Sequence, residues 1–494
     1  MLFQKLTEIA NTAPATSGLR QDSVTYPYAD LAGRVERLAG GLQSIGIGKG
    51  VPVALFIPNT VDFWMTAHAL FAIGAIAVPL NPNASPHELK TTAERCAIKA
   101  VIARPEHKAV VERLNADLGD KLSVVLTGDN GPMSVGELEK HAPGRIEALA
   151  DDTDAAYLFS SGSTGRSKIV PWTHGAMVRS GEFSARLQES NPGERALIGL
   201  PTFTSYGFNV GTGGEMYAGA TNVYWTDPRP AIMSRGAMLA LVERDRITRL
   251  PGVPFLFDLL AGVTDEVDLS SVRIASTGGV ALKKPTFDRF HERFGIPLRQ
   301  ALGMTETALI TFNMDPDPFS TWSSVGRPSE DVTVEIIPTP DAPTQDVGEV
   351  FVRAPGMTKG YKDVDPEVNA VFRNGGMMTG DLGKIGDNGH LYLTGRIKLI
   401  VEVSGMKVDP IEVEDVLMGH PAVAEAVVIG VPDPRTGEQR LKAVVVRRDD
   451  ETADAIIKYS RTKLTPHKVP TLLEFRDEIP KNGAGKILRG QLME

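Results

Sequence analysis

Cysteine, long hydrophobic runs and excess positive charge are all scarce in this chain. Cys96 is the only cysteine among 494 residues, so no disulfide can form within the chain. We therefore expect a reducing, cytoplasmic location, with Cys96 as a small buried apolar side chain. The net charge of -9 disfavours a general binder of nucleic acid or of membrane surfaces, because both partners require a basic surface.

Long apolar segments are also missing. The first 20 residues contain no such run, so the sequence predicts no signal peptide. The segment FWMTAHALFAIGAIAVPL (63–80) is interrupted by Gly74 and predicts a buried helix followed by a strand, not a membrane span. Hydrophobic residues make up 42% and charged residues 23%, as in ordinary globular proteins. The length indicates roughly two to four domains.

Strand and helix patterns alternate along most of the chain. Short β-branched runs such as 51–57 and 98–103 alternate with segments of helical spacing such as 61–73 and 107–118. This predicts an α/β fold with parallel sheets covered by helices.

The pattern changes near Val332. Segments with alternating polar and apolar residues follow, which predicts a small β subdomain over about 325–395. The last part returns to a mixture of helices and strands, typical of a compact α+β domain. We therefore predict a large N-terminal domain, 1–397, with two parallel-sheet αβα subdomains and the β subdomain, followed by a small C-terminal domain, 398–494.

One loop carries an unusual set of side chains. In YLFSSGSTGRSKIVPWTH (157–174), residues 160–165 are all Ser, Thr or Gly, and Arg166 and Lys168 follow. Glycines allow backbone N–H groups to converge on an anion, while hydroxyls and a lysine add donors and charge. The spacing is not that of a P-loop. A flexible linker is the alternative, but linkers rarely lie between strand-like runs.

Five further polar, glycine-containing segments lie beside apolar strand patterns. They are STGGVAL (276–282), ALGMTETAL (301–309), MMTGDLGKI (377–385), YLTGRIKLI (392–400) and PKNGAGKILRGQL (480–492). In this order and spacing they resemble the adenylate-forming superfamily, which includes acyl-CoA synthetases, luciferases and carrier-protein-loading adenylation domains. The resemblance extends over essentially the whole chain.

The resemblance implies a site for ATP and Mg²⁺. It implies that Gly278 and Gly279 lie along the adenine, and that Leu302 supplies an apolar contact where the family often has an aromatic residue. It also implies that Asp381 binds the ribose hydroxyls and that Arg396 makes a further contact with the ribose or a phosphate. The residues implied to contact the β- and γ-phosphates are Ser161, Ser163, Thr164, Gly165 and Lys168. Asp381 itself is expected in a glycine-framed turn.

The resemblance also implies the catalytic set, Thr164, Glu306 and Lys486. It implies that Glu306 binds Mg²⁺ and that its neighbour Thr305 contacts the α-phosphate. It also implies that Lys486 bridges the attacking carboxylate and the α-phosphate. Lys398 matches a hinge about which a mobile C-terminal domain rotates. The segment Ser404, Gly405 and Met406 matches the border of the pantetheine tunnel.

The acid-binding residues are less well indicated. The matching segments contain Phe203, Tyr206, Phe208 and Gly303, and Thr204 stands where the family often has His. Such aromatic residues are most often simply core. Their apolar character favours a fatty or aryl acid over an amino acid, whose ammonium group would require a carboxylate partner.

The sequence thus predicts an ATP-dependent carboxylic acid–CoA ligase. The acid and MgATP give acyl-AMP and pyrophosphate, and a thiol then attacks to give a thioester and AMP, with catalysis by positioning and charge neutralisation. Coenzyme A is the expected thiol because no carrier or condensation domain is recognisable. The alternatives are loading of a carrier protein or another acyl acceptor, and a non-catalytic nucleotide-binding regulator.

Overall fold

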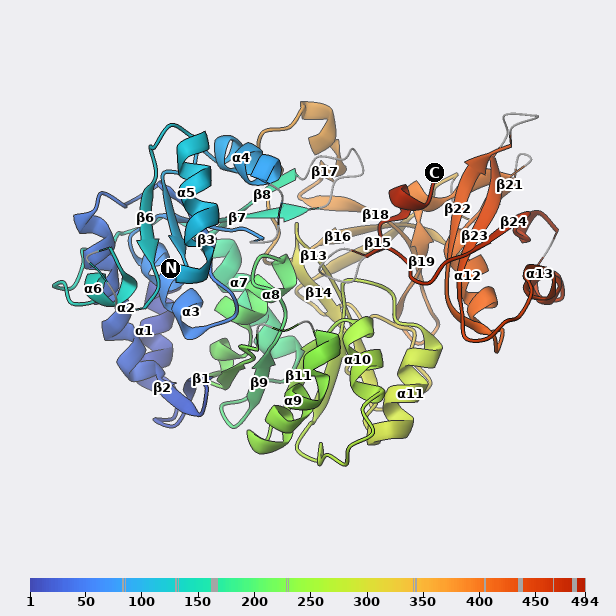
Figure 1. The fold of residues 1–494 in the computed structure, drawn as a ribbon, viewed down its shortest axis with the longest axis horizontal. Helices are drawn as coiled ribbons and strands as arrows, with labels where there is room; N and C mark the ends of the chain where they lie inside the picture. The colour runs from blue at the N-terminus through green and yellow to red at the C-terminus, as the bar shows by residue number, and fades with distance from the viewer. Residues whose placement is uncertain are drawn as a thin grey trace. The chain divides into compact units, whose positions relative to one another are not determined.

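The computed structural model describes residues 1–81, 84, 86–128, 131, 133–160, 168–227, 229, 231–340, 342, 344–403, 406–433, 439–464, 466–481 and 487–493. The chain divides into two compact units (Figure 1). The first consists of Met1–Trp322, Ser329–Val332 and Arg353–Gly375, and the second of Ser323–Pro328, Thr333–Val352 and Gly376–Glu494. This division does not test the predicted boundary and hinge at Lys398, which stay predictions.

A six-stranded sheet forms the first layer of the first unit. Its strands are parallel except for the antiparallel pair β7 and β8. Val53 and Leu55 face one side of the sheet and Ala54 and Phe56 the other, and all four are buried, as expected for a parallel sheet covered on both faces. The spatial order is β6 (Ser123–Leu126), β5 (Ala100–Ala103), β3 (Pro52–Phe56), β4 (Ile76–Pro79), β7 (Asp154–Ser160) and β8 (Lys168–Thr173).

An eight-stranded sheet forms the second layer of this unit. Its central strands are parallel, and only the two edge strands, β14 and β2, run antiparallel to their neighbours. The spatial order is β14 (Ala308–Phe312), β13 (Leu298–Met304), β12 (Ile274–Thr277), β11 (Arg249–Gly252), β9 (Arg195–Ile198), β10 (Thr221–Tyr224), β1 (Gly18–Gln21) and β2 (Val24–Pro27). The predicted α/β class is therefore confirmed.

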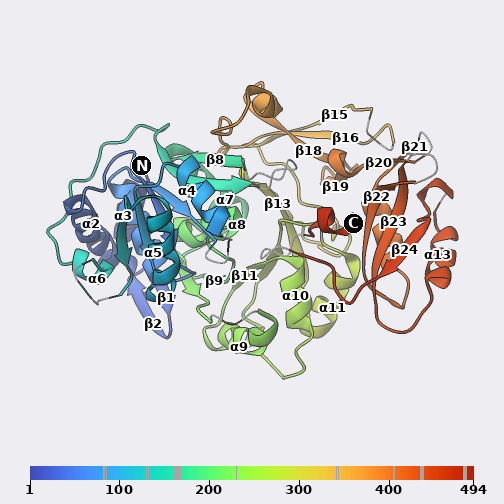
Figure 2. The ribbon, with the colours of Figure 1, turned by 45° about the horizontal axis from the view of Figure 1, so that its top comes forward.

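Helices cover both sheets of the first unit. Helices α4 and α5 pack on one face of the six-stranded sheet (Figure 2), and α9, α10 and α11 pack on the eight-stranded sheet (Figure 1). The helices of this unit are α1 (Leu2–Thr12), α2 (Tyr28–Ser44), α3 (Val61–Ala72), α4 (Pro86–Arg95), α5 (Lys108–Asp117), α6 (Val135–Leu138), α7 (His174–Leu187), α8 (Ser205–Thr212), α9 (Ala231–Arg244), α10 (Pro254–Ala261) and α11 (Lys284–Phe294). Its shorter elements are η1 (Pro105–His107), η2 (Gly214–Ala218), η3 (Pro366–Val371) and β17 (Phe372–Arg373).

The main core lies between the two sheets. It joins buried residues of α1, α2 and α3 to Val53 and Leu55 of the first sheet and to Ala196 and Ile198 of the second. Cys96 is buried in the separate core beneath α4 and α5, as predicted. None of the helices in the described part of the chain combines the length and the apolar character that a membrane crossing requires.

The second unit is built mainly from antiparallel sheets. One contains β15 (Thr333–Ile337), β16 (Gly348–Arg353), β18 (Gly376–Ile385) and β19 (Leu391–Arg396), and a second contains β22 (Val423–Pro432), β23 (Gln439–Arg447) and β24 (Leu472–Phe475). Strands β20 (Val401–Val403) and β21 (Met406–Val408) pair with each other. The remaining elements are η4 (Ile397–Leu399), α12 (Pro410–Met418), α13 (Ala453–Arg461), η5 (Pro466–Lys468) and η6 (Arg489–Leu492).

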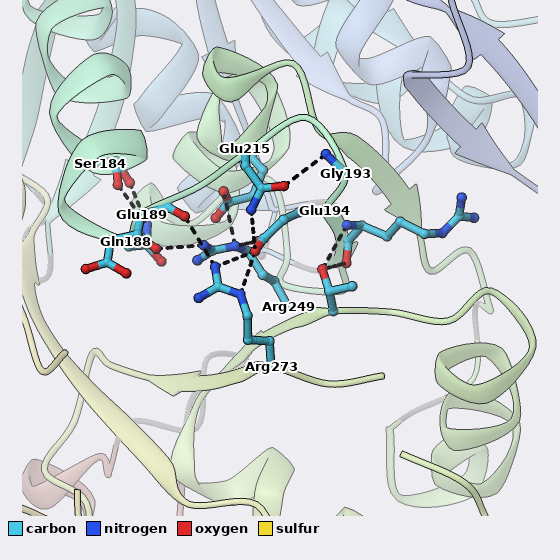
Figure 3. A network of polar contacts seen from close by, with 11 residues as sticks. Ser184, Gln188, Glu189, Gly193, Glu194, Glu215, Arg249 and Arg273 are labelled. Carbon is cyan, nitrogen blue, oxygen red and sulfur yellow. Dashed lines mark hydrogen bonds and ion pairs between the residues drawn. The ribbon is translucent and has the colours of Figure 1, made fainter. Parts of the chain in front are cut away.

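A buried ion network lies where the parallel strands of the eight-stranded sheet begin (Figure 3). Arg249, the first residue of β11, pairs with Glu194 and, at 3.5 Å, with Glu215 of η2. Arg273 donates to Glu194 through Nε at 2.7 Å. The Arg249 side chain is 3% exposed and that of Glu194 is 4% exposed. Burial raises the pKa of Glu215 to about 7 and lowers that of Arg249 to about 9.

Candidate active site

Two predicted nucleotide segments meet at the carboxyl edge of the eight-stranded sheet. Strand β12 ends at Thr277, and Gly278 and Gly279 follow; the parallel neighbour β13 ends at Met304, followed by Thr305 and Glu306. The carboxyl ends of parallel strands are where α/β proteins bind their ligands. The structure thus brings together residues that are 26 positions or more apart in the chain.

The two glycines of the first segment have separate structural reasons. A Cβ atom at Gly278 would lie 3.2 Å from the Ala301 carbonyl oxygen on β13, so a side chain there would crowd the neighbouring strand. Gly279 has φ of +82°, a left-handed conformation that L side chains rarely adopt, and its surroundings are open. Gly278 is buried and Gly279 is exposed, so it is the backbone at Gly279 that a ligand can approach at close range.

Thr305 is fixed by two elements that are distant in sequence. Its hydroxyl donates to the Ser205 hydroxyl at 3.0 Å, at the first residue of α8. Its carbonyl oxygen accepts a hydrogen bond of 2.9 Å from the indole N–H of Trp172 on β8. Thr204 caps α8, because its hydroxyl accepts from the backbone N–H of Gly207 at 3.1 Å. Thr204, which stands where the family often has His, thus stabilises the start of α8.

Glu306 is a buried carboxylate at this edge. It is 5% exposed, and its Oε1 accepts a hydrogen bond of 2.8 Å from the Tyr361 hydroxyl. Among the described residues no group of three or more His, Cys, Asp or Glu could hold a metal. Mg²⁺ in nucleotide sites is usually held by one or two carboxylates together with phosphate oxygens. A single buried carboxylate such as Glu306 is compatible with a metal ion of that kind.

The predicted acid-binding residues differ in their surroundings. Tyr206 is half-buried beside Gly278. Burial raises the pKa of its phenol to about 12, although a hydrogen bond with Ser276 acts to lower it. Phe203 is also half-buried. Phe208 is fully buried in the main core and packs edge-on against Phe63 at 6.0 Å between ring centroids. We therefore leave Phe208 out of the proposed acid-binding set.

Strand β13 is irregular beside this site. Its pairing with β14 shifts register between Leu302 and Gly303. Leu302 is 7% exposed, while Gly303 is exposed, and a Cβ atom at Gly303 would lie 2.8 Å from the Ala308 carbonyl oxygen. Asp258 of α10 accepts from Thr286 at 2.8 Å and pairs with an arginine of α11.

The second unit places Asp381 and Arg396 opposite each other. They are cross-strand partners on β18 and β19, and Arg396 Nε donates to Asp381 Oδ1. The expectation that Asp381 lies in a turn is wrong, because it lies inside β18. Gly380 before it has φ of +74°, so the glycine makes a local irregularity within a continuous strand instead of a chain reversal.

Several predicted residues fall outside the described part of the chain. Lys168 is described and begins β8. Met406 begins β21 and Lys398 lies in η4, but their side chains are not described. The predicted residues that lie outside the described residues altogether are Ser161, Ser163, Thr164, Gly165, Ser404, Gly405 and Lys486.

Sequence reasoning missed Ser205, Trp172 and Tyr361. They lie 100, 133 and 55 positions from their partners at Thr305 and Glu306. No local spacing connects such residues. The glycine before the tyrosine in TKGYKD was the one available signal.

Two family profiles match most of this chain. The profile for AMP-binding enzymes matches residues 6–362, and that for the AMP-binding enzyme C-terminal domain matches residues 412–486. A feruloyl-CoA synthase from Amycolatopsis sp. is 32% identical over 492 residues, which cover 98% of this chain and 96% of that protein.

Two solved structures resemble the whole chain. ATP-bound MatB from Rhodopseudomonas palustris has a TM-score of 0.89 at 25% identity and covers 100% of this chain and 98% of its own. The amide bond synthetase McbA from Marinactinospora thermotolerans has a TM-score of 0.87 at 27% identity, covering 100% and 99%. The chain therefore belongs to the AMP-binding enzymes and, with them, to the adenylate-forming superfamily.

Proposed function

We propose that this chain joins an apolar aryl or fatty acid to coenzyme A, with an acyl-AMP intermediate formed from ATP. The observation that carries the proposal is the Thr305–Glu306 turn beside Gly278 and Gly279 at one sheet edge. A hydroxyl, a carboxylate suited to Mg²⁺ and a close backbone surface are what attack on an α-phosphate requires. The match to a feruloyl-CoA synthase supports an aryl acid and a CoA acceptor.

The roles that we propose for side chains follow from charge. Mg²⁺, when bound between Glu306 and ATP, would offset phosphate charge. Lys168 and the loop 161–167 would hold the β- and γ-phosphates, and Asp381 with Arg396 would hold the ribose. Lys486 would neutralise charge as the carboxylate meets the α-phosphate, an interaction strongest near the transition state.

The acid site is proposed from Phe203, Tyr206 and Gly303. Tyr206 lies beside Gly278, so its ring borders the site proposed for the adenylate. We also propose a cytoplasmic location, which the presence of a single cysteine, Cys96, supports. Burial raises the pKa of the Cys96 thiol to about 12.

A screen of carboxylic acids by pyrophosphate release would test the reaction class. Cinnamic, benzoic, medium-chain fatty and amino acids are incubated with MgATP, with or without CoA, and products are identified by mass spectrometry. We expect aryl or fatty acids to give acyl-AMP without CoA and acyl-CoA with it. Release of pyrophosphate with none of these acids would contradict the proposal, as would activity with amino acids alone.

A second acceptor class has specific support. The likeness to an amide bond synthetase over the whole chain makes amide formation the next candidate. Adding an amine in place of CoA distinguishes the two functions. If the chain forms an amide and no thioester when both the amine and CoA are present, this alternative is favoured.

Lys486→Ala separates the half-reactions. We expect adenylation to fall by about 10²–10³, as for loss of one preorganised donor, while supplied acyl-AMP and CoA still give thioester at close to the native rate. Lys463→Ala, which removes an exposed lysine of the second unit, is the matched control and should change neither step. Equal loss of both steps in Lys486→Ala would assign the lysine a structural role.

A further inference from the structure

The segment around Tyr361 is attached to two parts of the candidate active site. The backbone N–H of Lys362 donates to the Ile169 carbonyl oxygen at 2.9 Å, next to Lys168 on β8. The backbone N–H of Thr358 donates to the Glu306 carbonyl oxygen at 2.8 Å. Tyr361 thus lies between two backbone attachments, one beside the phosphate-loop lysine and one at the carboxylate proposed for the metal.

The local frame around Tyr361 is also well defined. The Asn369 side chain accepts from the Tyr361 backbone N–H at 2.7 Å and donates to its carbonyl oxygen at 3.2 Å. Phe372 packs edge-on against the tyrosine ring at 5.1 Å between centroids. The residue is 7% exposed. Its ring is therefore held by packing and its backbone by a two-bond side-chain clamp.

The Tyr361 side chain has two different functional contacts. Its hydroxyl donates to Glu306 Oε1 at 2.8 Å. The ammonium nitrogen of Lys168 lies 4.3 Å from the ring centroid, over its face. One residue thus contacts an anion through its hydroxyl and a cation through its ring.

We propose that Tyr361 is a positioning residue that fixes the Glu306 carboxylate for Mg²⁺ and the Lys168 ammonium for the ATP phosphates. The proposal rests on the proposed function, because it takes the roles of Glu306 and Lys168 from it. The hydroxyl bond to Oε1 orients the carboxylate and leaves Oε2 for the metal. The ring supports the lysine without competing for its hydrogen-bond donors, since a cation–π contact uses the ring face.

The two contacts can be separated by substitution. Tyr361→Phe keeps the ring and removes the hydroxyl, whereas Tyr361→Leu removes both. Loss of a partner that orients a metal ligand typically costs about 10–100-fold in metal affinity or activity. We therefore expect Tyr361→Phe to weaken ATP binding by about this factor when Mg²⁺ is present and to leave ATP binding in EDTA unchanged. Tyr361→Leu should also weaken ATP binding in EDTA, by a further factor of about 2–30.

The full chain is titrated calorimetrically with ATP, once in Mg²⁺ and once in EDTA. The ratio of the two dissociation constants then measures the contribution of the metal to ATP binding. This ratio is independent of a general loss of stability. The same variants are assayed for pyrophosphate release and for thioester formation from supplied acyl-AMP. We expect only the first of these rates to fall in Tyr361→Phe.

The chain provides a matched control in Tyr157. This buried tyrosine donates to Asp154 at 3.0 Å and has the Lys362 ammonium 4.6 Å from its ring centroid, so it has both kinds of contact without Glu306; its hydroxyl also accepts from that ammonium at 2.7 Å. Tyr157→Phe should therefore leave the Mg²⁺ ratio unchanged. A Glu306→Gln background provides a second check, because there Tyr361→Phe should add no further change to the ratio.

The outcomes separate this inference from the proposed function. If the native chain binds ATP more tightly with Mg²⁺ and Tyr361→Phe keeps the native ratio, the positioning role is rejected and the proposed function stands. A similar loss in Tyr157→Phe also rejects it. If the native chain does not bind ATP under either condition, both proposals fail together.

Discussion

Removal of Arg249 should destabilise the first unit strongly without touching the candidate active site. In Arg249→Met the apolar stem is kept and the charge is lost, so Glu215 loses its ion-pair partner at 3.5 Å and still feels the charge of Arg273, while Glu194 retains its pair with Arg273. Breaking a buried pair by removing one partner typically costs about 3–5 kcal/mol. With Arg249 only 3% exposed, solvent offers little compensation.

This cost translates into a measurable shift of melting temperature. For the first unit, with about 350 residues, an unfolding entropy of about 2.1 cal/mol/K per residue gives roughly 0.7 kcal/mol/K. A loss of about 3–5 kcal/mol therefore corresponds to a fall of roughly 4–7 °C. Differential scanning calorimetry of the native chain and the variant would measure it.

The pH dependence of the melting temperature tests whether the loss of stability comes from the charge of Glu215. Glu215 has a folded pKa of about 7, above its unfolded value, so its contribution to stability is present at low pH and is lost as pH rises through the folded value. Without Arg249 the remaining carboxylate is more costly when charged. The melting temperature of Arg249→Met should therefore fall further below native at pH 8 than at pH 6.

The double variant Arg249→Met/Glu215→Gln removes both charges and should recover part of the loss, since paired removal leaves no uncompensated ion. A fall of less than about 1 °C in the single variant would refute the reasoning, because a broken buried pair cannot cost so little at this unit size. A fall that is equal at both pH values and is not reduced in the double variant would refute it as well.

Three further variants test the candidate site. Glu306→Gln should keep the melting temperature and lose most pyrophosphate release, because it removes a full charge from the proposed metal ligand; near-native release at ordinary Mg²⁺ would contradict the assignment. Asp381→Asn should raise the KM for ATP because it weakens acceptance from the ribose hydroxyls and leaves Arg396 facing a neutral amide; an unchanged KM would reject a ribose role. Lys398→Pro restricts φ at the predicted hinge and should slow thioester formation far more than adenylation, whereas equal loss of both steps would argue against a hinge there.

The sequence was most informative where structure is local. Period and composition predicted the alternation of strands and helices, and the glycine-containing segments do follow strand ends at Thr277 and Met304. The order of strands in the eight-stranded sheet could not be predicted in the same way. Strand β1, near the N-terminus, pairs with β10, about 200 residues later, and such pairing depends on packing of the whole chain.

In the candidate site, too, local features could be predicted and long-range contacts could not. Motif residues such as Glu306 were identifiable, but their partners Tyr361 and Ser205 were not, because a single hydrogen bond between distant segments leaves no periodic signal. Asp381 was misplaced for a different reason. Glycines beside a polar residue predict a turn, and only the ladder between β18 and β19 reveals a strand that tolerates a left-handed glycine.

The single buried cysteine has a practical consequence for observing motion. Because Cys96 is 4% exposed and its thiol resists ionisation, the native chain should be nearly silent toward maleimide dyes, which react with thiolates. Two cysteines introduced at exposed positions, one in each unit, could therefore carry a donor and an acceptor fluorophore without removal of the native residue. Energy transfer between them would report directly whether the units change their separation when an acid and ATP are followed by coenzyme A.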